Sequence, residues 1–174
     1  MSDLSIRALE PRDIAAITGI YADAVRHGTA SFEIEPPDEI EMAARRDVLL
    51  AGGYPFLVAE LGGAVVGYAY AGPYRARPAY RWTIEDSIYI APQAQQRGLG
   101  RALLARLITE AEARGFRQMI AVIGDSANAA SIALHAAVGF RLIGTLQSVG
   151  FKHGRWLDTV VMQRPLGSAN ATPP

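Results

Sequence analysis

Apolar residues recur along this chain with two different periods, and the changes of period mark the expected elements. Over 4–8 they alternate with polar residues, which predicts a short strand. After Pro11-Arg12-Asp13, with Asp13 as a helix N-cap, they recur every three or four residues, which predicts a helix. Its apolar face carries Ile14, Ile17, Tyr21 and Val25. An irregular stretch over 27–37 precedes a second expected helix over 38–50. The second helix would present Ile40, Ala44 and Val48.

The rest of the chain has the pattern of a sheet interrupted by helices. Two apolar runs flank Gly62-Gly63, which predicts a hairpin. A strand over 82–90 leads through Gly98 into a long helix that Gly115 ends. The remaining expected elements are a strand at 119–123, a helix at 128–138, and strands at 141–146 and 157–162. Residues 167–174 indicate a disordered tail. We therefore expect one domain over 1–166, of the α/β (α+β) class, with a mixed and largely antiparallel sheet flanked by helices.

Composition and charge exclude several classes of function. Seventeen basic and seventeen acidic residues give the 174-residue chain a formal net charge of zero, which argues against a sequence-independent nucleic-acid binder. The chain has no cysteine and only three dispersed histidines, so neither thiolate catalysis nor a metal site is expected. No run approaches the roughly 18 apolar residues of a membrane span, and charges interrupt the N-terminal stretch where a signal peptide would be apolar. We expect no membrane partner and a cytoplasmic location.

The segment around Gly98-Leu99-Gly100 carries the most informative chemistry. A strand runs into a glycine turn and then into the first turn of a helix, where free N–H groups and the helix dipole favour an anion such as a phosphate. Arg97 and Arg101 add positive charge. The chain lacks the Gly-Lys-Ser/Thr of a P-loop, and Leu103 stands where a dinucleotide fingerprint has its third glycine. A purely structural turn is the alternative.

Several motifs in a fixed order make this loop more specific. They are Gly53-Tyr54-Pro55, the strand from Trp82 to Ile90, Gln95-x-x-Gly98-x-Gly100, Asn128-x-x-Ser131-x-x-Leu134-His135, Gly139-Phe140 and the segment from Val149 to Asp158. From Ile6 to Leu166 the chain resembles the GNAT-family N-acetyltransferases, most of all the phosphinothricin/methionine sulfoximine acetyltransferase branch. The resemblance implies the GNAT fold and transfer of acetyl from acetyl-CoA to the α-amine of an amino-acid-like acceptor. Phosphinothricin, methionine sulfoximine and methionine sulfone are the candidate acceptors.

The resemblance also implies which residues bind acetyl-CoA. The pyrophosphate would be held by the backbone N–H groups of Gln96, Arg97, Gly98, Leu99, Gly100 and Arg101. The pantetheine amides would pair with the strand edge formed by Ile88, Tyr89 and Ile90, as an added strand does. Asn128 would bond the pantetheine arm, although it also suits a helix N-cap. A backbone N–H near Tyr89 or Ile90 would stabilise the oxyanion of acetyl transfer.

The acceptor amine needs a base, and Glu85 is the candidate, because burial would raise its pKa toward neutrality. The alternative for Glu85 is a structural pair with an arginine such as Arg81. The acid that protonates the leaving thiolate stays open between His135, a tyrosine and solvent, and His135 is otherwise a histidine at the edge of the core.

Arg75 and Arg81 match substrate-contacting arginines of this branch and would bind the acceptor's carboxylate or phosphinate. Phe32 falls in the loop that covers the acceptor in this family, or it only packs. The segment over 151–158 resembles one that lines the site and the dimer interface, so a homodimer is expected. Two other hypotheses remain: a non-catalytic acyl-CoA-binding sensor module, and a GNAT enzyme acting on another amine. A nicotinamide-dependent oxidoreductase is disfavoured by the missing third glycine.

Overall fold

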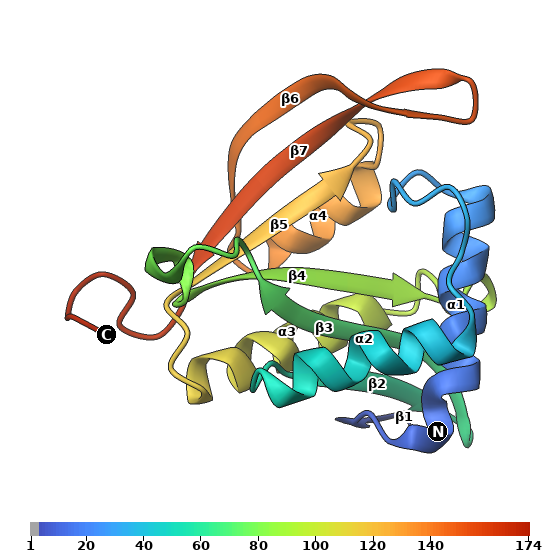
Figure 1. Ribbon diagram of the computed structural model, residues 1–174, viewed down its shortest axis with the longest axis horizontal. Coiled ribbons are helices and arrows are strands. Elements are labelled where there is room, and N and C mark those ends of the chain that lie inside the picture. The colour runs from blue at the N-terminus through green and yellow to red at the C-terminus, as the bar shows by residue number, and fades with distance from the viewer. Residues whose placement is uncertain (1–3) are drawn as a thin grey trace.

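The computed structural model describes residues 4–174, and over that range it consists of one mixed sheet with helices on both faces (Figure 1). The strands are β1 (Leu4–Ala8), β2 (Phe56–Leu61), β3 (Ala64–Pro73), β4 (Thr83–Ile90), β5 (Gln118–Gly124), β6 (Arg141–Lys152) and β7 (Arg155–Pro165). The helices are α1 (Ile14–His27), α2 (Glu39–Ala51), α3 (Leu99–Ala113) and α4 (Ala129–Ala137), with short 3-10 turns at Pro11–Asp13, Pro78–Tyr80 and Pro92–Ala94.

The strands follow the order β1-β2-β3-β4-β5-β7-β6 across the sheet. Among the pairs within residues 4–174, β4 and β5 run parallel and the other neighbours run antiparallel. The hairpin predicted at Gly62-Gly63 joins β2 to β3, and both glycines have positive φ, at 59° and 81°. The mixed, largely antiparallel sheet expected from the sequence is confirmed.

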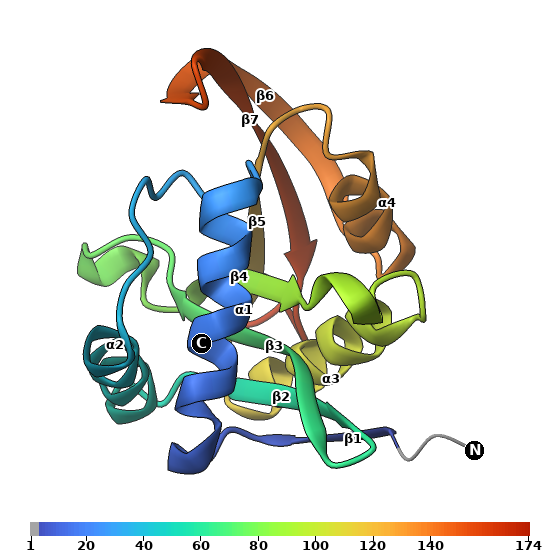
Figure 2. The ribbon, with the colours of Figure 1, turned by 90° about the vertical axis from the view of Figure 1, so that its right-hand side faces the viewer.

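Two apolar cores hold the helices against the sheet. On one face α3 buries Leu103, Leu104 and Leu107 completely. On the other face α1 buries Ile17 and Val25 among the aromatic residues of β2 and β3. Figure 2 shows the result, with α1 and α2 on one side of the sheet and α3 and α4 on the other. Helix α1 is therefore fixed by the apolar face that the three-to-four-residue period predicted, whereas α2 is not.

The predicted face of α2 is wrong. Ile40 and Val48 are 81% and 72% exposed, whereas Met42 is 5% exposed and packs against α1 and the sheet. Ala43 and Leu49 flank Met42 in that contact. The short helix carries two apolar stripes, and a hydrophobic period alone does not say which one meets the core.

The start of α1 also differs in detail from the sequence expectation. Pro11–Asp13 forms a 3-10 turn, and α1 begins at Ile14 with Asp13 in the N-cap position. The Asp13 carboxylate does not cap α1; it accepts hydrogen bonds from the Glu10 N–H and the Arg7 guanidinium. The Arg7 contact lowers the pKa of Asp13 below its usual range. Asp13 therefore joins α1 to β1 rather than closing the helix.

The last two strands are longer than predicted and form an arm beyond the rest of the sheet (Figure 1). We call β6 and β7 together the β6–β7 arm. The register shifts between Leu146 and Gly150, so the alternation breaks at the point where the predicted strand ends. Such an irregularity bends an antiparallel pair without ending it. The apolar side chains of the arm that are more than half exposed are Leu142, Ile143, Leu146, Val149, Phe151 and Trp156.

After β7, Leu166 is buried and the chain continues in turns. Arg117 donates to the carbonyl oxygens of Ala169 and Pro173, at 3.5 and 3.2 Å. The expected domain over 1–166, whose first three residues lie outside the described range, and the disordered tail over 167–174 stay predictions.

Candidate active site

The centre of the site is the point where β4 and β5 part. Their parallel register runs from Thr83 opposite Gln118 to Asp86 opposite Ala121, and both strands then continue without pairing to each other. Figure 1 shows the two strands diverging beyond this point. An opening in the middle of a sheet exposes backbone edges that would otherwise be hydrogen-bonded.

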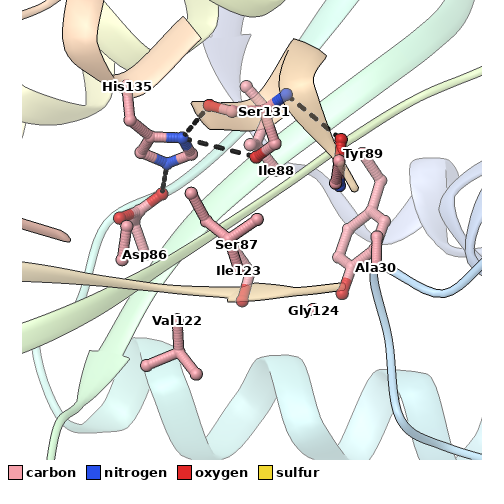
Figure 3. Close-up of a pocket in the computed structure, with 12 residues that line it drawn as sticks. Ala30, Asp86, Ser87, Ile88, Tyr89, Val122, Ile123, Gly124, Ser131 and His135 are labelled. Carbon is pink, nitrogen blue, oxygen red and sulfur yellow. Dashed lines mark hydrogen bonds and ion pairs between the residues drawn. The ribbon is translucent and has the colours of Figure 1, made fainter. Parts of the chain in front are cut away.

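Three adjoining cavities occupy this opening, with volumes of about 50, 450 and 210 Å³. Ala30 and Tyr89 line all three, so the cavities adjoin at these residues. The smallest lies between β4, β5 and α4 (Figure 3). The largest lies between the end of α1 and the end of β4, and the third contains Glu85 and Phe32. Neighbouring cavities therefore extend from the α4 side of the sheet to Glu85.

The loop between β4 and α3 has the shape of an anion site. Gln96 and Gly98 have positive φ, at 59° and 78°, and Gly98 is the N-cap of α3 without a side chain to satisfy the first N–H groups. Arg97 and Arg101 are exposed beside them. Uncapped N–H groups at a helix start, with cations beside them, favour a phosphate. The binding of a phosphate by this loop stays a prediction.

The end of β4 presents to the opening an edge that pairs with no other strand of residues 4–174, where the Ile90 carbonyl oxygen accepts a hydrogen bond from the Gln95 side-chain amide at 3.2 Å. On one side Tyr89 pairs with Tyr68 of β3, and the Ala91 N–H donates to the Val66 carbonyl at 2.9 Å. Because backbone groups alternate along a strand, the N–H and C=O of Ile88 and Ile90 point to the other side, toward the opening. This edge can accept an added extended chain.

Asn128 is placed for both roles that the sequence allowed, as a helix N-cap and as a residue facing the opening. Its Oδ1 accepts the Ser131 N–H at 3.2 Å, so it caps α4. The same residue lines the two cavities on the α4 side of the opening. An N-cap role therefore leaves Asn128 in reach of a molecule bound in these two cavities.

Glu85 lies half-buried on the face of β4 that looks into the third cavity, together with Ser87 and Tyr89. Burial raises the pKa of its carboxyl to about 7, and the negative charge of Asp86 adds to the rise, while Arg75 opposes it. A carboxylate with a pKa near neutrality is matched to general-base chemistry.

Asp86 and His135 form a buried pair on the opposite face of β4 (Figure 3). His135 Nε2 lies 2.9 Å from Asp86 Oδ2, and Nδ1 donates to the Ser131 carbonyl oxygen at 2.7 Å. Burial by itself lowers the pKa of His135, but these hydrogen bonds and the Asp86 charge raise it overall. Sequence reasoning named His135 and missed Asp86, whose alternation with Glu85 along the strand was the available signal.

The three residues expected to contact the acceptor do not lie together in the structure. Phe32 lines the cavity of Glu85. Arg75 is exposed, lies over the Tyr74 ring at 5.1 Å, and its charge reaches Glu85. Arg81 lies over the Trp82 ring at 5.2 Å and lines none of the three cavities. Arg75 lines none of the three cavities either, so the structure places Phe32 in the cavity of Glu85 and Arg75 only within range of the Glu85 charge.

Sequence reasoning missed the small residues that line the third cavity, which contains Glu85. Ala30, Val122, Gly124 and Thr159 complete its lining from the α1–α2 loop, β5 and β7. Nothing in their local sequence marks them, because they meet only in the folded chain. Among residues 4–174 there is no cluster of three or more potential metal-ligating side chains, and no helix of that range is long and apolar enough to span a membrane.

Comparisons with known proteins identify the class. The model of the acetyltransferase (GNAT) domain family matches residues 6–161, so the chain belongs to the GNAT acetyltransferase family. Within that family it falls in the phosphinothricin/methionine sulfoximine acetyltransferase branch. Phosphinothricin N-acetyltransferase of Alcaligenes faecalis is 56% identical over 170 residues, which cover 98% of this chain and 86% of the relative. The L-methionine sulfoximine/L-methionine sulfone acetyltransferase of Salmonella typhimurium is 44% identical over 163 residues, covering 94% and 95%.

A solved structure gives the same assignment. The crystal structure of a GNAT superfamily phosphinothricin acetyltransferase from Sinorhizobium meliloti, in complex with acetyl-CoA, matches with a TM-score of 0.95 and 51% identity, covering 98% of this chain and 92% of that one. The family and fold expected from the motifs are therefore confirmed, whereas the roles of individual residues stay predictions.

Proposed function

We propose that this protein is an acetyl-CoA-dependent N-acetyltransferase acting on the α-amine of amino acids of the phosphinothricin and methionine sulfoximine type. Its relatives of that name, at 56% and 44% identity over nearly the whole chain, support the reaction and the acceptor class. The single observation that carries the proposal is the group of cavities at the parting of β4 and β5. Their linings extend from Gln95, in the loop that leads into α3, to the carboxylate of Glu85.

The residues beside the opening fit acetyl-CoA, which supplies the activated acetyl group when bound. The uncapped N–H groups from Gln96 to Arg101 suit its diphosphate. The edge of β4 at Ile88 and Ile90 suits the amides of its pantetheine arm, and Asn128 lies beside the same cavities. The Sinorhizobium meliloti relative has been solved with acetyl-CoA, which supports this fit.

Each group then has a chemical task in the transfer. Glu85, with its pKa near 7, takes the proton that the acceptor's ammonium must lose before its nitrogen can attack. The Ile90 N–H, which faces the opening, donates to the thioester oxygen as negative charge develops there. Arg75 offers its guanidinium to the acceptor's anionic group. Either His135, a tyrosine or solvent protonates the thiolate.

We also propose a homodimer and a cytoplasmic location. The exposed apolar side chains on the β6–β7 arm support the dimer, because a patch of this kind marks an interface more often than a solvent-exposed face. Light scattering after gel filtration, at micromolar concentration, should give twice the 18.7 kDa of one chain, and a mass of one chain would reject the dimer. The location is a prediction from the sequence alone.

A thiol-release assay tests the function. Acetyl-CoA is incubated with the protein and with phosphinothricin, methionine sulfoximine, methionine sulfone, a polyamine or an aminoglycoside, and the products are identified by mass spectrometry. We expect thiol release and N-acetylated product with the first three. Tight acetyl-CoA binding without release would support the sensor module instead. Faster release with the amines that lack a carboxylate would move the enzyme to another acceptor class.

A further inference from the structure

The loop between α1 and α2 lies between the β6–β7 arm and the cavity of Glu85, where we propose that the acceptor binds, and its Phe32 ring packs against Gly150 of the arm. A methyl group built on Gly150 of β6 would come within 3.0 Å of three atoms of the Phe32 ring. A methyl group on Gly124 of β5 would lie 3.0 Å from the same ring and 2.9 Å from the Ala30 carbonyl oxygen. Two glycines from separate strands thus make the space that the ring occupies.

Lys152, two residues beyond Gly150, fixes the backbone of the same loop. Its side chain is buried, with 3% of the residue exposed, and Nζ donates to the Ser31 carbonyl oxygen at 2.7 Å. Burial lowers the pKa of this ammonium, opposed by the charge of Glu33. A buried cation aimed at one backbone carbonyl is a costly arrangement, so the position of Ser31 depends strongly on it.

The helices hold the same loop from its other side. The Tyr21 hydroxyl shares a hydrogen bond with Ser31 Oγ at 2.8 Å and donates to Glu33 at 2.9 Å. Arg45 of α2 pairs with both oxygens of Glu33, at 2.6 and 3.2 Å. Ser31 is therefore clamped between α1 and the arm, and Phe32 follows it directly into the cavity of Glu85.

We propose that the β6–β7 arm sets the size of the acceptor cavity through Phe32, with Gly150 and Lys152 as positioning residues for acceptor selection. This inference rests on the proposed N-acetyltransferase function, because Phe32 selects an acceptor only where an acceptor binds beside Glu85. Neither residue touches the reacting atoms. Gly150 leaves room for the ring behind the cavity, and Lys152 keeps the loop from moving away from the arm.

The direction of the effect follows from the packing. The ring lies against both glycines, so a side chain at Gly150 pushes it away from the strands and into the cavity that Glu85 and Ser87 line. A smaller cavity excludes acceptors with long side chains before short ones. Loss of the Lys152 bond instead loosens the loop and weakens binding of every acceptor.

The first part of the test compares Gly150→Ala with Gly144→Ala, its matched control. Both glycines lie in β6 with ordinary backbone conformations, and a methyl group on Gly144 meets nothing within 4 Å. We expect Gly150→Ala to lower kcat/KM for methionine sulfone by about 10-fold or more, a loss typical of overpacking, and to lower it less for 2-aminobutyrate. The acetyl-CoA dissociation constant should not change. Gly144→Ala should behave as wild type, and Phe32→Ala in the Gly150→Ala background should restore the preference for the longer acceptor.

The second part of the test compares Lys152→Met with Lys152→Gln. Met keeps most of the length of the lysine side chain and removes the donor, whereas Gln keeps a neutral donor. Removing a charged hydrogen bond should raise KM for the acceptor by about 10-fold with little change in kcat, and Lys152→Gln should recover part of the loss. Hydrogen–deuterium exchange of the free protein gives a readout without any substrate. Amides over 28–33 should exchange faster in Lys152→Met, while those of α3 should not.

The results separate the two ideas. A wild-type protein that acetylates none of the amino acids contradicts the proposed function, and the exchange measurement still decides whether the arm holds the loop. The inference is overturned by unchanged exchange over 28–33 in Lys152→Met. It is equally overturned by active Gly150→Ala and Gly144→Ala enzymes that treat long and short acceptors alike.

Discussion

The cofactor side and the acceptor side of the opening are built from different materials. On the side where we propose that acetyl-CoA binds, the groups assigned to the cofactor are mainly backbone groups of one continuous segment, from Ile88 to Arg101, with the Asn128 side chain beside them. On the acceptor side they are side chains from five separate places in the chain. These are the α1–α2 loop, the loop before β4, β4 itself, β5 and β7.

This contrast predicts which side of the opening tolerates substitution and which does not. A backbone site depends on glycine conformations and on a helix start, so few sequences can form it and its motif is local. A side-chain site can change its acceptor by single substitutions while the sheet stays the same. The predictions below test each side separately.

The largest effect should come from the acceptor side, at Glu85. Replacing Glu85 by Gln keeps its shape and removes the proton acceptor, so kcat/KM at neutral pH should fall by roughly 10²–10⁴-fold. The wild-type rate should rise with pH as the carboxyl, with a pKa of about 7, loses its proton. This rise is the acidic limb of the pH profile, and it should vanish in the variant. High pH should recover part of the rate because the acceptor amine then deprotonates by itself. A variant with the wild-type rate and pH profile would remove Glu85 from the mechanism.

On the cofactor side, Gly98→Val should weaken acetyl-CoA binding with little effect on the acceptor's KM. Gly98 has φ of 78°, which a β-branched residue adopts only at a cost of about 1–3 kcal/mol, so the N–H groups of the first turn of α3 lose their alignment. We expect about a 10-fold to 100-fold rise in the acetyl-CoA dissociation constant by calorimetry. Gly144→Val is the control for a glycine change elsewhere. An unchanged constant in a folded Gly98→Val protein would contradict the anion-site assignment.

Substitutions of Arg75 and of Arg81 should differ clearly in their effect on kcat/KM. Arg75 acts on Glu85 through its charge, whereas Arg81 stacks on Trp82 away from the cavities. Arg75→Ala should lower kcat/KM for a free amino acid by about 10-fold and change little for its amide, as loss of a charged hydrogen bond predicts. It should also raise the pKa of Glu85 and move the acidic limb to higher pH. Arg81→Ala should be much milder, and equal losses for the two variants would show that both contact the acceptor.

The smallest effect should be a shift of pH dependence from Asp86→Asn. The charge of Asp86 helps to raise the pKa of Glu85, so removing it should move the acidic limb to lower pH. The same change removes the partner that raises the pKa of His135, which NMR titration of the imidazole can follow. A limb that moves up, or stays in place while His135 titrates lower, would contradict this coupling.

The same contrast decides how much could be predicted from the sequence. The glycine loop, the strand of Glu85 and the N-cap at Asn128 were found because each is a local pattern, and the structure places them around one opening. Other features depend on segments that meet only after folding. They are the cavity lining at Val122 and Thr159 and the space beside Gly150 that the Phe32 ring fills.

The errors at the level of elements have similar causes. Helix α2 has two apolar stripes, and only its contact with α1 selects Met42 over Ile40. Strand β6 was predicted too short because its register shifts near Leu146 and because its residues from Arg141 to Phe151 are exposed or half-exposed on both faces, so the alternation that marks a half-buried strand is absent. In both places tertiary contacts decide what a local period leaves open.

The central claim is that acetyl passes through the opening in the sheet from a backbone-built site to a side-chain-built one. A crystal structure with acetyl-CoA and methionine sulfone tests it most directly. We predict the diphosphate at the N–H groups of 96–101, the pantetheine along Ile88 and Ile90, and the acceptor amine on the opposite side, within hydrogen-bond reach of Glu85 directly or through one water. Acetyl-CoA bound away from the start of α3, or both ligands on the same side of the opening with Glu85 facing neither, would contradict the account.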